Sequence, residues 1–595
     1  MCAQPSEQAY HFSPKPNKAH LIHWNPWEEK VFSRAQGEDR PIFLSISAVW
    51  CHWCHVFDET TLSDPGVIEL LNRDFLCIRV DADRNPHIQS RYLAGGWPTS
   101  AFLTPTGDVI LSGTYVHPED FKELALKVKE YYKARKGDLY ARIARFKVEK
   151  RLDMERQKVT GRELTQEIPL KVIASIKGTY DPTHGGFGDE PKFPQPDALE
   201  LLFVEYQISG GEDLLDIATN TLDSMMRSEL WDTVEKGFFR YSTKADWSSP
   251  HYEKMLEANA GLLKDYLLAY QATGKDTYRK VAEEILAYVD SKLCSPEGGF
   301  YGSQDADEEY YKQDVQGRTK FSLPPVDKSL YANWNGLTIS QYLHAYSILR
   351  NESYLDRALR TLDLLMKKAY QPKKGMYHYV IDEEIGLAGL LVDQVYMAET
   401  LVVAYETTTQ KRYLELAIDV MDYVVQYLGD KTRGGFFDIP EETSLIGNLS
   451  LKEKPLHENS LAARVLNRLY HLTGKEAYHN EAERALKAFL EVYPEYSFQA
   501  ASYALAVMEL IYPPIKVVVV GPKGDPRTIA MHKEALDIPK YWKVVQVIDP
   551  RTDTLKIGDV EYPSLENPVA YICKDGVCSP PFEDPLEIKR FIREK

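Results

Sequence analysis

Residues 50–55 read Trp-Cys-His-Trp-Cys-His, and this stretch concentrates reactive side chains in one local frame. It follows the apolar run 41–46, whose isoleucine and phenylalanine content and length are typical of a buried strand. Cys51 is therefore expected where the strand gives way to a helix. A helix N-terminus favours a thiolate there, because its unpaired backbone N–H groups and positive dipole end stabilise negative charge. Cys54 lies one turn later, placed to form a disulfide with Cys51.

The residues after this motif extend the pattern. Residues 75–81 predict a second strand, and Asp64-Pro65-Gly66 predicts a turn and a helix start between the two strands. Residues 95–99 predict a turn that contains Pro98, and an X-Pro bond is the one peptide bond that readily becomes cis. The pattern resembles the thioredoxin fold, in which a cis-proline loop faces a redox pair. The resemblance implies that Pro98 lies opposite Cys51 and Cys54 and positions a substrate strand.

Three other interpretations of the motif remain open. The spacing C-x-x-C-H also fits covalent haem attachment with His55 as axial ligand, although that needs an exported, haem-loaded context. A metal site could use Cys51, His52, Cys54 and His55, but zinc sites usually have two separated pairs of ligands. A thioredoxin-shaped domain could also bind or signal without turnover, because fold does not imply function. We therefore expect neither a metal nor a cofactor.

Length and composition limit the class of protein. A chain of 595 residues is expected to form several domains, and its net charge of −17 argues against nucleic acid or an anionic membrane as a partner. Seven cysteines are few and odd in number, which fits a reducing compartment. Residues 1–20 lack the apolar core of a signal peptide, and no apolar run approaches the roughly 20 residues of a membrane helix. We expect a cytoplasmic protein.

From about residue 168 the chain repeats itself. A Gly-aromatic motif recurs at residues 185–187, 237–239, 298–300, 375–377 and 434–436, and short polar turns lie between its copies. Apolar residues at helical spacing predict twelve helices near 167–180, 196–210, 213–228, 253–273, 276–293, 333–350, 353–370, 391–408, 411–428, 457–473, 476–493 and 497–511. Alternating long and short connections place every Gly-aromatic loop at one end of a set of helical hairpins. Six hairpins with one crowded loop face predict a closed (α/α)6 toroid rather than an open solenoid.

Polar side chains gather on the predicted loop face of this toroid. The candidate ligand-binding residues are Lys192, His251, Glu253, Lys254, Asn259, Asp305, Asp307, Trp334 and Asn335. Carboxylates, histidines and aromatic rings at one mouth are what carbohydrate chemistry uses. Each residue taken alone also has a structural interpretation, as a helix cap, a solvated loop or loop packing. Their common face therefore supports a binding site better than it supports a reaction.

The C-terminal part predicts a small α/β segment. Strands are expected at 515–522, 541–548 and 569–573, with a helix at 529–536. Cys573 and Cys578 lie five positions apart, and this spacing favours two ordinary thiols over a second redox pair.

Several multi-residue motifs occur together in one order: the thioredoxin-like start, then residues 185–188, 191–194, 251–256, 298–301, 305–307 and 334–337. With them the chain resembles the spermatogenesis-associated protein 20-like family, although it departs from that pattern at 391–394 and 455–460. The resemblance implies a multidomain α/β plus all-α protein, with a thioredoxin-like domain joined to a six-hairpin glycosidase-like toroid. It implies no activity or substrate. We expect a thioredoxin-like domain at 1–126, a helical connector at 127–166, the toroid at 167–512 and the C-terminal α/β segment at 513–595.

The expected function is thiol–disulfide exchange coupled to a toroid that binds or processes carbohydrate. Cys51 is expected to attack as a thiolate and Cys54 to resolve the mixed disulfide, while His52 and Trp53 tune thiolate stability and access. The expected partner is a protein disulfide or a small-molecule thiol. One alternative is a sugar epimerase or glycoside-processing enzyme with the thioredoxin-like domain as scaffold, for which His251, Glu253, Asp305 and Asp307 are the acid and base candidates. A non-catalytic interaction protein is the other.

Overall fold

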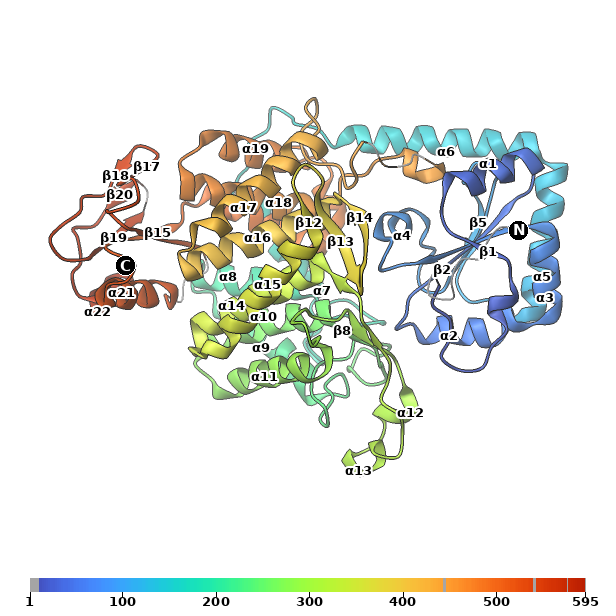
Figure 1. The fold of residues 1–595 in the computed structure, drawn as a ribbon, viewed down its shortest axis with the longest axis horizontal. Helices are drawn as coiled ribbons and strands as arrows, with labels where there is room; N and C mark the ends of the chain where they lie inside the picture. The colour runs from blue at the N-terminus through green and yellow to red at the C-terminus, as the bar shows by residue number, and fades with distance from the viewer. Residues whose placement is uncertain (1–9, 442, 444–445, 539–541, 575, 594–595) are drawn as a thin grey trace. The chain divides into compact units, whose positions relative to one another are not determined.

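The computed structural model describes residues 10–441, 443, 446–538, 542–574 and 576–593 (Figure 1). The chain forms two compact units. One contains Met1–Glu155, Ser303–Asp327 and Asp438–Glu453, and the other contains Arg156–Gly302, Lys328–Phe437 and Lys454–Lys595. Residues 1–9 of the expected leader-free N-terminus, and residue 541 at the start of a predicted strand, lie outside the described residues.

The first unit is built on a five-stranded mixed sheet. Its strands are β1 (Trp24–Asn25), β2 (Ile42–Ser47), β3 (Leu76–Asp81), β4 (Thr99–Leu103) and β5 (Val109–Gly113). They lie in the order β1-β3-β2-β4-β5, with β2 parallel to β3 and antiparallel to β4. Every residue of β2 is buried, as expected for a central strand of apolar residues.

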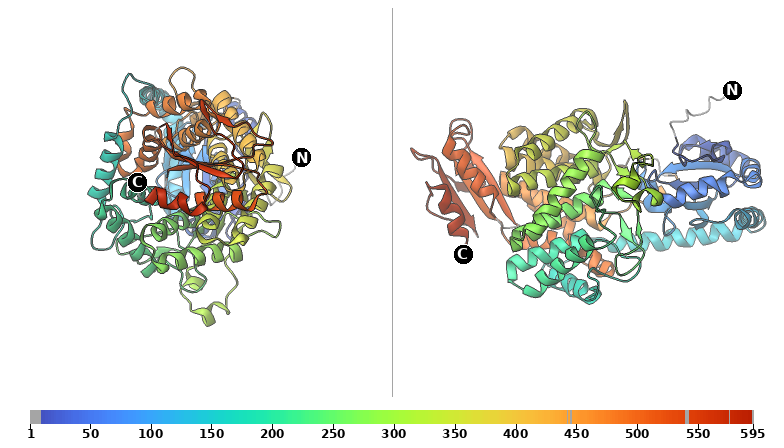
Figure 2. Two further views of the ribbon diagram at one scale, coloured as in Figure 1. Left: turned by 90° about the vertical axis from the view of Figure 1, so that its left-hand side faces the viewer. Right: turned by 90° about the horizontal axis from the view of Figure 1, so that it is seen from below.

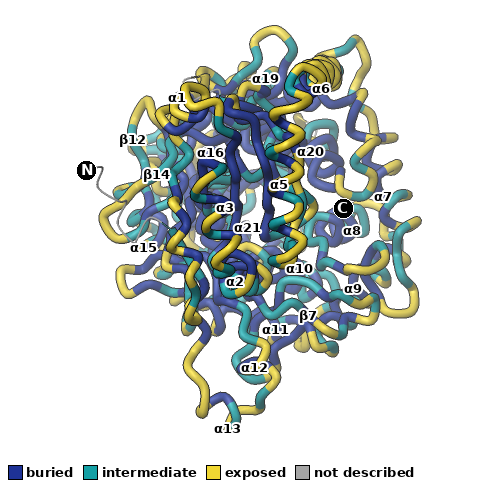
Figure 3. The backbone as a smooth tube through the Cα atoms, turned by 90° about the vertical axis from the view of Figure 1, so that its right-hand side faces the viewer, coloured by how far each residue is buried: buried dark blue, intermediate teal, exposed yellow. Residues whose placement is uncertain are grey.

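Helices cover this sheet and continue out of it: α1 (Glu29–Glu38), α2 (His52–Glu59), α3 (Pro65–Asp74), α4 (Pro86–Tyr92), α5 (Pro118–Ala134) and α6 (Lys136–Arg156). The core contains Phe43, whose ring centroid lies 5.4 Å from that of Phe102 and 5.3 Å from that of Phe121. Figure 3 shows buried strands behind α3 and α5, whose outer faces are exposed. The thioredoxin-like fold predicted from the sequence is confirmed.

Two segments from far along the chain belong to this first unit. Residues 303–327 carry β9 (Ser303–Gln304), α12 (Glu308–Tyr311), α13 (Val315–Arg318) and β10 (Val326–Asp327), and β9 pairs with β10. The second segment, 438–453, is held against α4, where the Arg91 guanidinium donates two hydrogen bonds of 2.7 and 3.0 Å to the Asp438 carboxylate. The four-part division expected from the sequence did not foresee these insertions, and its boundaries stay a prediction.

The second unit contains a closed double ring of helices (Figure 2). The inner ring consists of α8 (Pro196–Ser209), α10 (Leu256–Thr273), α14 (Ala332–Leu349), α16 (Leu391–Thr408), α18 (Leu456–Thr473) and α20 (Ala501–Ile511). Each inner helix contacts the next, and α20 contacts α8, so the ring closes. The outer helices are α7 (Glu167–Thr179), α9 (Glu212–Arg227), α11 (Asp276–Tyr288), α15 (Glu352–Ala369), α17 (Lys411–Tyr423) and α19 (Glu476–Lys487). The predicted toroid is confirmed, and each of the twelve predicted helices has its counterpart.

Short strands in the loops of the second unit were not predicted. The main sheet joins β11 (Leu330–Tyr331), β12 (Tyr370–Gln371), β13 (Gly375–Ile381) and β14 (Glu384–Ala388). Smaller pieces are β6 (Tyr241–Ser242), β7 (Pro250–His251) and β8 (Lys254–Met255). Residues of β13 are alternately buried and partly exposed, which is the strand period. The alternating pattern of β13 was not recognised from the sequence, because the strand begins with a Gly-aromatic motif and such motifs elsewhere in the chain form loops.

The C-terminal segment is the predicted small α/β structure. Its sheet has the order β16-β15-β19-β20, formed by β15 (Ile515–Val520), β16 (Lys543–Ile548), β19 (Val569–Lys574) and β20 (Val577–Cys578). Helices α21 (Pro526–Leu536) and α22 (Pro585–Arg593) and the hairpin β17 (Lys556–Ile557) to β18 (Val560–Glu561) accompany it. Cys573 and Cys578 form a disulfide, unlike the ordinary thiols favoured from the sequence. The reason is strand register, because β19 and β20 place the two cysteines directly opposite each other.

In the described part of the chain, no helix combines the length and the apolar character needed to cross a membrane.

Candidate functional site

The two cysteines of the motif lie at the N-terminus of α2, directly after β2. Cys51 is the N-cap residue of α2, and its Sγ accepts a hydrogen bond of 3.1 Å from the backbone N–H of Cys54. The two sulfur atoms are 2.26 Å apart. Cys51 is 4 % exposed and Cys54 is 2 % exposed. The structure thus confirms the expected position of this pair between a strand and a helix.

Aromatic side chains flank the cysteine pair. The Trp50 indole donates a hydrogen bond of 2.6 Å to the Asp83 carboxylate, and its ring lies edge-on to Trp97 with centroids 5.3 Å apart. The Trp97–Pro98 bond is cis, and the contact between the Trp50 and Trp97 rings places the proline loop beside the motif. His52 and Trp53 follow Cys51 on α2, and the exposed Trp53 ring packs against Tyr115. Their expected influence on the thiolate is not tested by these contacts.

His55, at the end of the motif, is held in a fixed orientation. Its Nε2 lies 3.0 Å from the Val49 carbonyl oxygen, and its Nδ1 lies 3.7 Å from Oδ2 of Asp305. Burial lowers the pKa of His55 below its ordinary value, so the imidazole is neutral near pH 7. The neutral ring then donates its Nε2 proton to Val49. Among the described residues no group of three or more His, Cys, Asp or Glu side chains is arranged to hold a metal ion.

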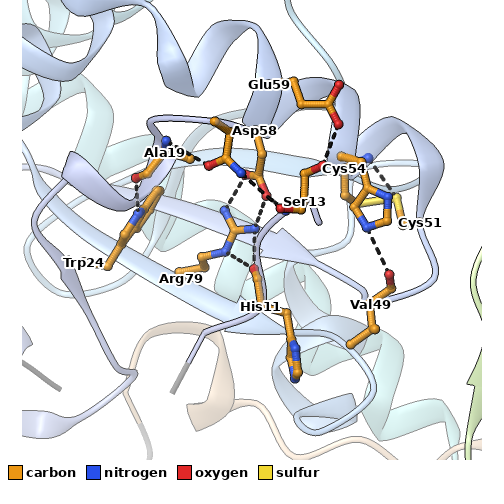
Figure 4. Close-up of polar contacts among 12 residues, drawn as sticks. His11, Ser13, Ala19, Trp24, Val49, Cys51, Cys54, Asp58, Glu59 and Arg79 are labelled. Atoms are coloured by element: carbon orange, nitrogen blue, oxygen red, sulfur yellow. Dashed lines mark hydrogen bonds and ion pairs between the residues drawn. A yellow bond between two sulfur atoms is a disulfide. The ribbon is translucent and has the colours of Figure 1, made fainter. Parts of the chain in front are cut away.

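A buried ion pair fixes α2 to the sheet (Figure 4). The Asp58 carboxylate on α2 accepts two hydrogen bonds of 2.8 Å from the guanidinium of Arg79 on β3. The same guanidinium donates to the carbonyl oxygen of His11, and the backbone N–H of Ser13 donates to Asp58. Both charged side chains are almost completely buried. This network holds the helix that carries Cys54 against the N-terminal segment.

Two of the predicted toroid residues are buried lysines that brace the Gly-aromatic loops. Lys192 donates to Asp181 at 2.7 Å and to the carbonyl of Gly185 at 3.0 Å. Lys254 donates to Asp232 at 2.6 Å and to the carbonyl of Lys236 at 2.7 Å. Both side chains are fully buried. Their charges are neutralised inside the protein, and their surroundings give no support to the predicted ligand contact.

The predicted Asn259 and Asn335 belong to a repeated amide clamp. The Asn335 amide accepts from the N–H of Phe300 and donates to the carbonyls of Phe300 and Tyr331, all at 2.9 Å. The fourth residue of four inner helices makes this set of bonds to the Gly-aromatic loop: Asn259, Asn335, Gln394 and Asn459. The loops also need glycine. Gly237 has a φ of 77°, and an added Cβ would lie 2.7 Å from the Tyr288 ring.

The remaining predicted toroid residues each have contacts of their own. His251 stacks on Tyr241 with ring centroids 4.4 Å apart, and its Nδ1 lies 3.5 Å from the buried Glu253 carboxylate. Trp334 packs edge-on against Tyr331. Asp305 and Asp307 lie in the other unit, where Asp305 approaches His55 and Asp307 caps α12 through the N–H of Tyr310. The candidates are thus assigned to both units, and their convergence at a single mouth stays a prediction.

Four titratable side chains near the starts of the inner helices are not among the candidate ligand-binding residues, although the sequence places Glu257 and His457 on the loop face: Asp197, Glu257, Tyr396 and His457. The Nδ1 of His457 lies 3.1 Å from Oδ2 of Asp197, and its Nε2 lies 2.9 Å from the Tyr396 hydroxyl. Glu257 and His457 each lie two residues before a clamp amide, and Asp197 has the same place in α8, so the sequence held a signal for these three residues.

Comparison with known proteins agrees with this architecture. The DUF255 family model, described as a protein of unknown function, matches residues 11–150, and the N-acylglucosamine 2-epimerase model matches residues 201–457. Spermatogenesis-associated protein 20 of Homo sapiens is 25% identical to this chain over 96% of the chain and 90% of that protein. The chain belongs to the spermatogenesis-associated protein 20-like family.

Two further proteins are similar to this chain over nearly its whole length. Spermatogenesis-associated protein 20 of Rattus norvegicus is 24% identical over 96% of this chain and 90% of that protein. An uncharacterized protein of Caenorhabditis elegans is 23% identical over 96% of this chain and 95% of that protein. Among solved structures, the cellobiose 2-epimerase from Spirochaeta thermophila has a TM-score of 0.46 and 14% identity, covering 58% of this chain and 96% of that chain.

Proposed function

We propose that the N-terminal unit catalyses thiol–disulfide exchange through Cys51 and Cys54. The observation that carries this proposal is the contact between their sulfur atoms at the N-terminus of α2. A position at the N-terminus of a helix stabilises a thiolate. The backbone N–H of Cys54 supplies part of this stabilisation, because it donates a hydrogen bond to Cys51 Sγ.

The exchange proceeds in two steps that conserve electrons. The Cys51 thiolate attacks a substrate disulfide, forms a mixed disulfide and releases one substrate sulfur as a thiolate. Cys54, after losing its proton to solvent, attacks the Cys51 sulfur and releases the second substrate sulfur. The substrate gains two electrons, and the chain is left with the Cys51–Cys54 disulfide. The predicted reducing cytoplasm supplies the small-molecule thiol that returns this disulfide to two thiols.

The test is a titration of the full chain in glutathione redox buffers, read by thiol alkylation and mass. The titration uses a Cys573→Ser/Cys578→Ser background, so that the second disulfide does not contribute. We expect a reversible two-electron transition that C51S and C54S abolish, and a Cys51 pKa below the free-cysteine value of about 8.5. An ordinary Cys51 pKa without a reversible disulfide would refute the proposal and leave the N-terminal unit as a scaffold.

We also propose that the toroid binds a carbohydrate or a related polar ligand. The match of residues 201–457 to the N-acylglucosamine 2-epimerase model supports this, because that range contains most of the inner ring. A sugar epimerase or glycoside-processing activity is the alternative, and it predicts a change in sugar configuration or chain length visible by NMR. A non-catalytic interaction protein predicts neither sugar turnover nor stabilisation by sugars. The test is the melting temperature of the full chain with and without sugars. A sugar that binds the folded state raises this temperature, because binding stabilises the folded state.

A further inference from the structure

The six inner helices place equivalent side chains at one end of the ring. Each inner helix follows a loop and begins at that end. The second residues of these helices are Asp197, Glu257, Asn333, Val392, His457 and Ser502. Five of the six are polar, although the helices themselves are buried on most faces.

Polar contacts across the ring show that two of these side chains, Asp197 and His457, meet in its interior. Asp197 begins α8 and His457 begins α18, and α20 lies between these two helices in the ring. The 3.1 Å contact between Asp197 and His457 therefore spans the inside of the ring. Tyr396, one turn into α16, reaches the same place through its 2.9 Å contact with His457. Three inner helices thus contribute to one connected set of polar groups.

The polar side chains are partly exposed at this level and buried further along the inner helices. The side chains of Asp197 and His457 are 38 % and 39 % exposed. About one to two turns deeper, Arg464 bridges Glu200 at 3.2 Å and Glu509 at 2.9 Å, and Lys264 pairs with Glu200. Glu200 and Glu509 are only 3 % and 5 % exposed. This ion-paired layer is therefore buried beneath the partly exposed side chains.

The protonation states give this end of the ring both donors and acceptors. Burial acts to lower the pKa of His457, but the Asp197 carboxylate outweighs it and the pKa rises to about 9. The imidazolium donates Nδ1–H to Asp197 and Nε2–H to the Tyr396 oxygen, which leaves the phenol proton free to donate. Glu257 is exposed, but the protein atoms around it displace part of its hydration and so raise the pKa of its carboxyl above the ordinary value.

We propose that this end of the ring binds an uncharged, polyhydroxylated small molecule through four side chains: Asp197, Glu257, Tyr396 and His457. The imidazolium of His457 is already paired with Asp197, and Lys264 and Arg464 below are paired with glutamates, so these cations are neutralised and give no attraction for an anion. Hydroxyl groups can both donate to carboxylate oxygens and accept from the phenol. This inference rests on the proposed carbohydrate function of the toroid and is independent of the redox proposal.

The test measures binding of D-glucose, D-mannose and N-acetyl-D-glucosamine to the full chain by calorimetry and thermal shift, with glucose 6-phosphate as the charged comparison. We expect at least one uncharged sugar to bind, and H457Q and E257Q each to raise its Kd at least tenfold, which corresponds to about 1.4 kcal/mol. The matched control is H479Q on the outer helix α19, which should keep the wild-type Kd. Circular dichroism and melting without ligand establish that each variant is folded.

The possible results distinguish this site from the broader proposal that the toroid binds carbohydrate. Absence of sugar binding to the wild-type chain would overturn both the carbohydrate proposal and the ligand class assigned to the ring. Equal sugar binding by the wild-type chain, H457Q and E257Q would keep the carbohydrate proposal and overturn this site. Tighter binding of glucose 6-phosphate than of glucose would overturn the uncharged ligand class. General stabilisation by excluded sugar would raise the melting temperature of every variant equally, and calorimetry would then show no binding.

Discussion

Asn335→Ala is expected to destabilise the toroid strongly, because the amide clamp serves the fold. The substitution leaves the buried N–H and C=O of Phe300 without the partners they now have at 2.9 Å, and it also removes the bond to Tyr331. An unsatisfied buried polar group costs about 1–3 kcal/mol, so two such groups and a small void together lower the free energy of unfolding by about 3–5 kcal/mol.

The assay is urea unfolding of the full chain, followed by far-ultraviolet circular dichroism and tryptophan fluorescence. The matched control is Asn333→Ala on the same helix, two residues earlier, whose side-chain oxygen has no hydrogen-bond partner. We expect this control to unfold within about 0.5 kcal/mol of the wild-type chain. Wild-type stability of N335A would refute the reasoning and restore Asn335 as a candidate ligand contact, as the sequence had suggested.

Three further predictions concern other parts of the molecule. Arg79→Met should lower the free energy of unfolding by about 3–5 kcal/mol by leaving Asp58 buried without its partner, and D58N/R79M should recover part of that loss in the same urea assay. His532, whose pKa burial lowers to about 4, stays neutral in the folded chain while the unfolded chain binds a proton below pH 6.5. Stability should therefore fall on the order of 3 kcal/mol between pH 6.5 and 4, and H532Q should reduce that slope in denaturation series against pH. Replacing both Cys573 and Cys578 by serine should lower the stability of the C-terminal segment by about 2 kcal/mol, seen as faster hydrogen exchange there; unchanged exchange would contradict it.

Local patterns made much of the fold predictable. The strand before Cys51 and the helix after it follow from an apolar run and a helix-start position, and the twelve toroid helices follow from apolar spacing. The site residues depended on long-range contacts that spacing does not encode. Asn335 was chosen as a polar residue near a loop face, but its partner Phe300 lies 35 positions away. Asp305 looked like a toroid residue by its place in the chain, whereas it packs beside His55 in the other unit.

The membership of residues 438–453 in the N-terminal unit has a consequence for synthesis. Residue 438 is made 283 positions after residue 155, where the first part of that unit ends. At about 5–20 residues per second, this delay is roughly 15 to 55 seconds. Throughout that time the Arg91 guanidinium, which is almost fully buried in the folded protein, lacks its ion pair with Asp438. The nascent thioredoxin-like domain therefore completes its assembly only after most of the toroid has left the ribosome, and a fragment that ends near residue 155 keeps an arginine whose partner never arrives.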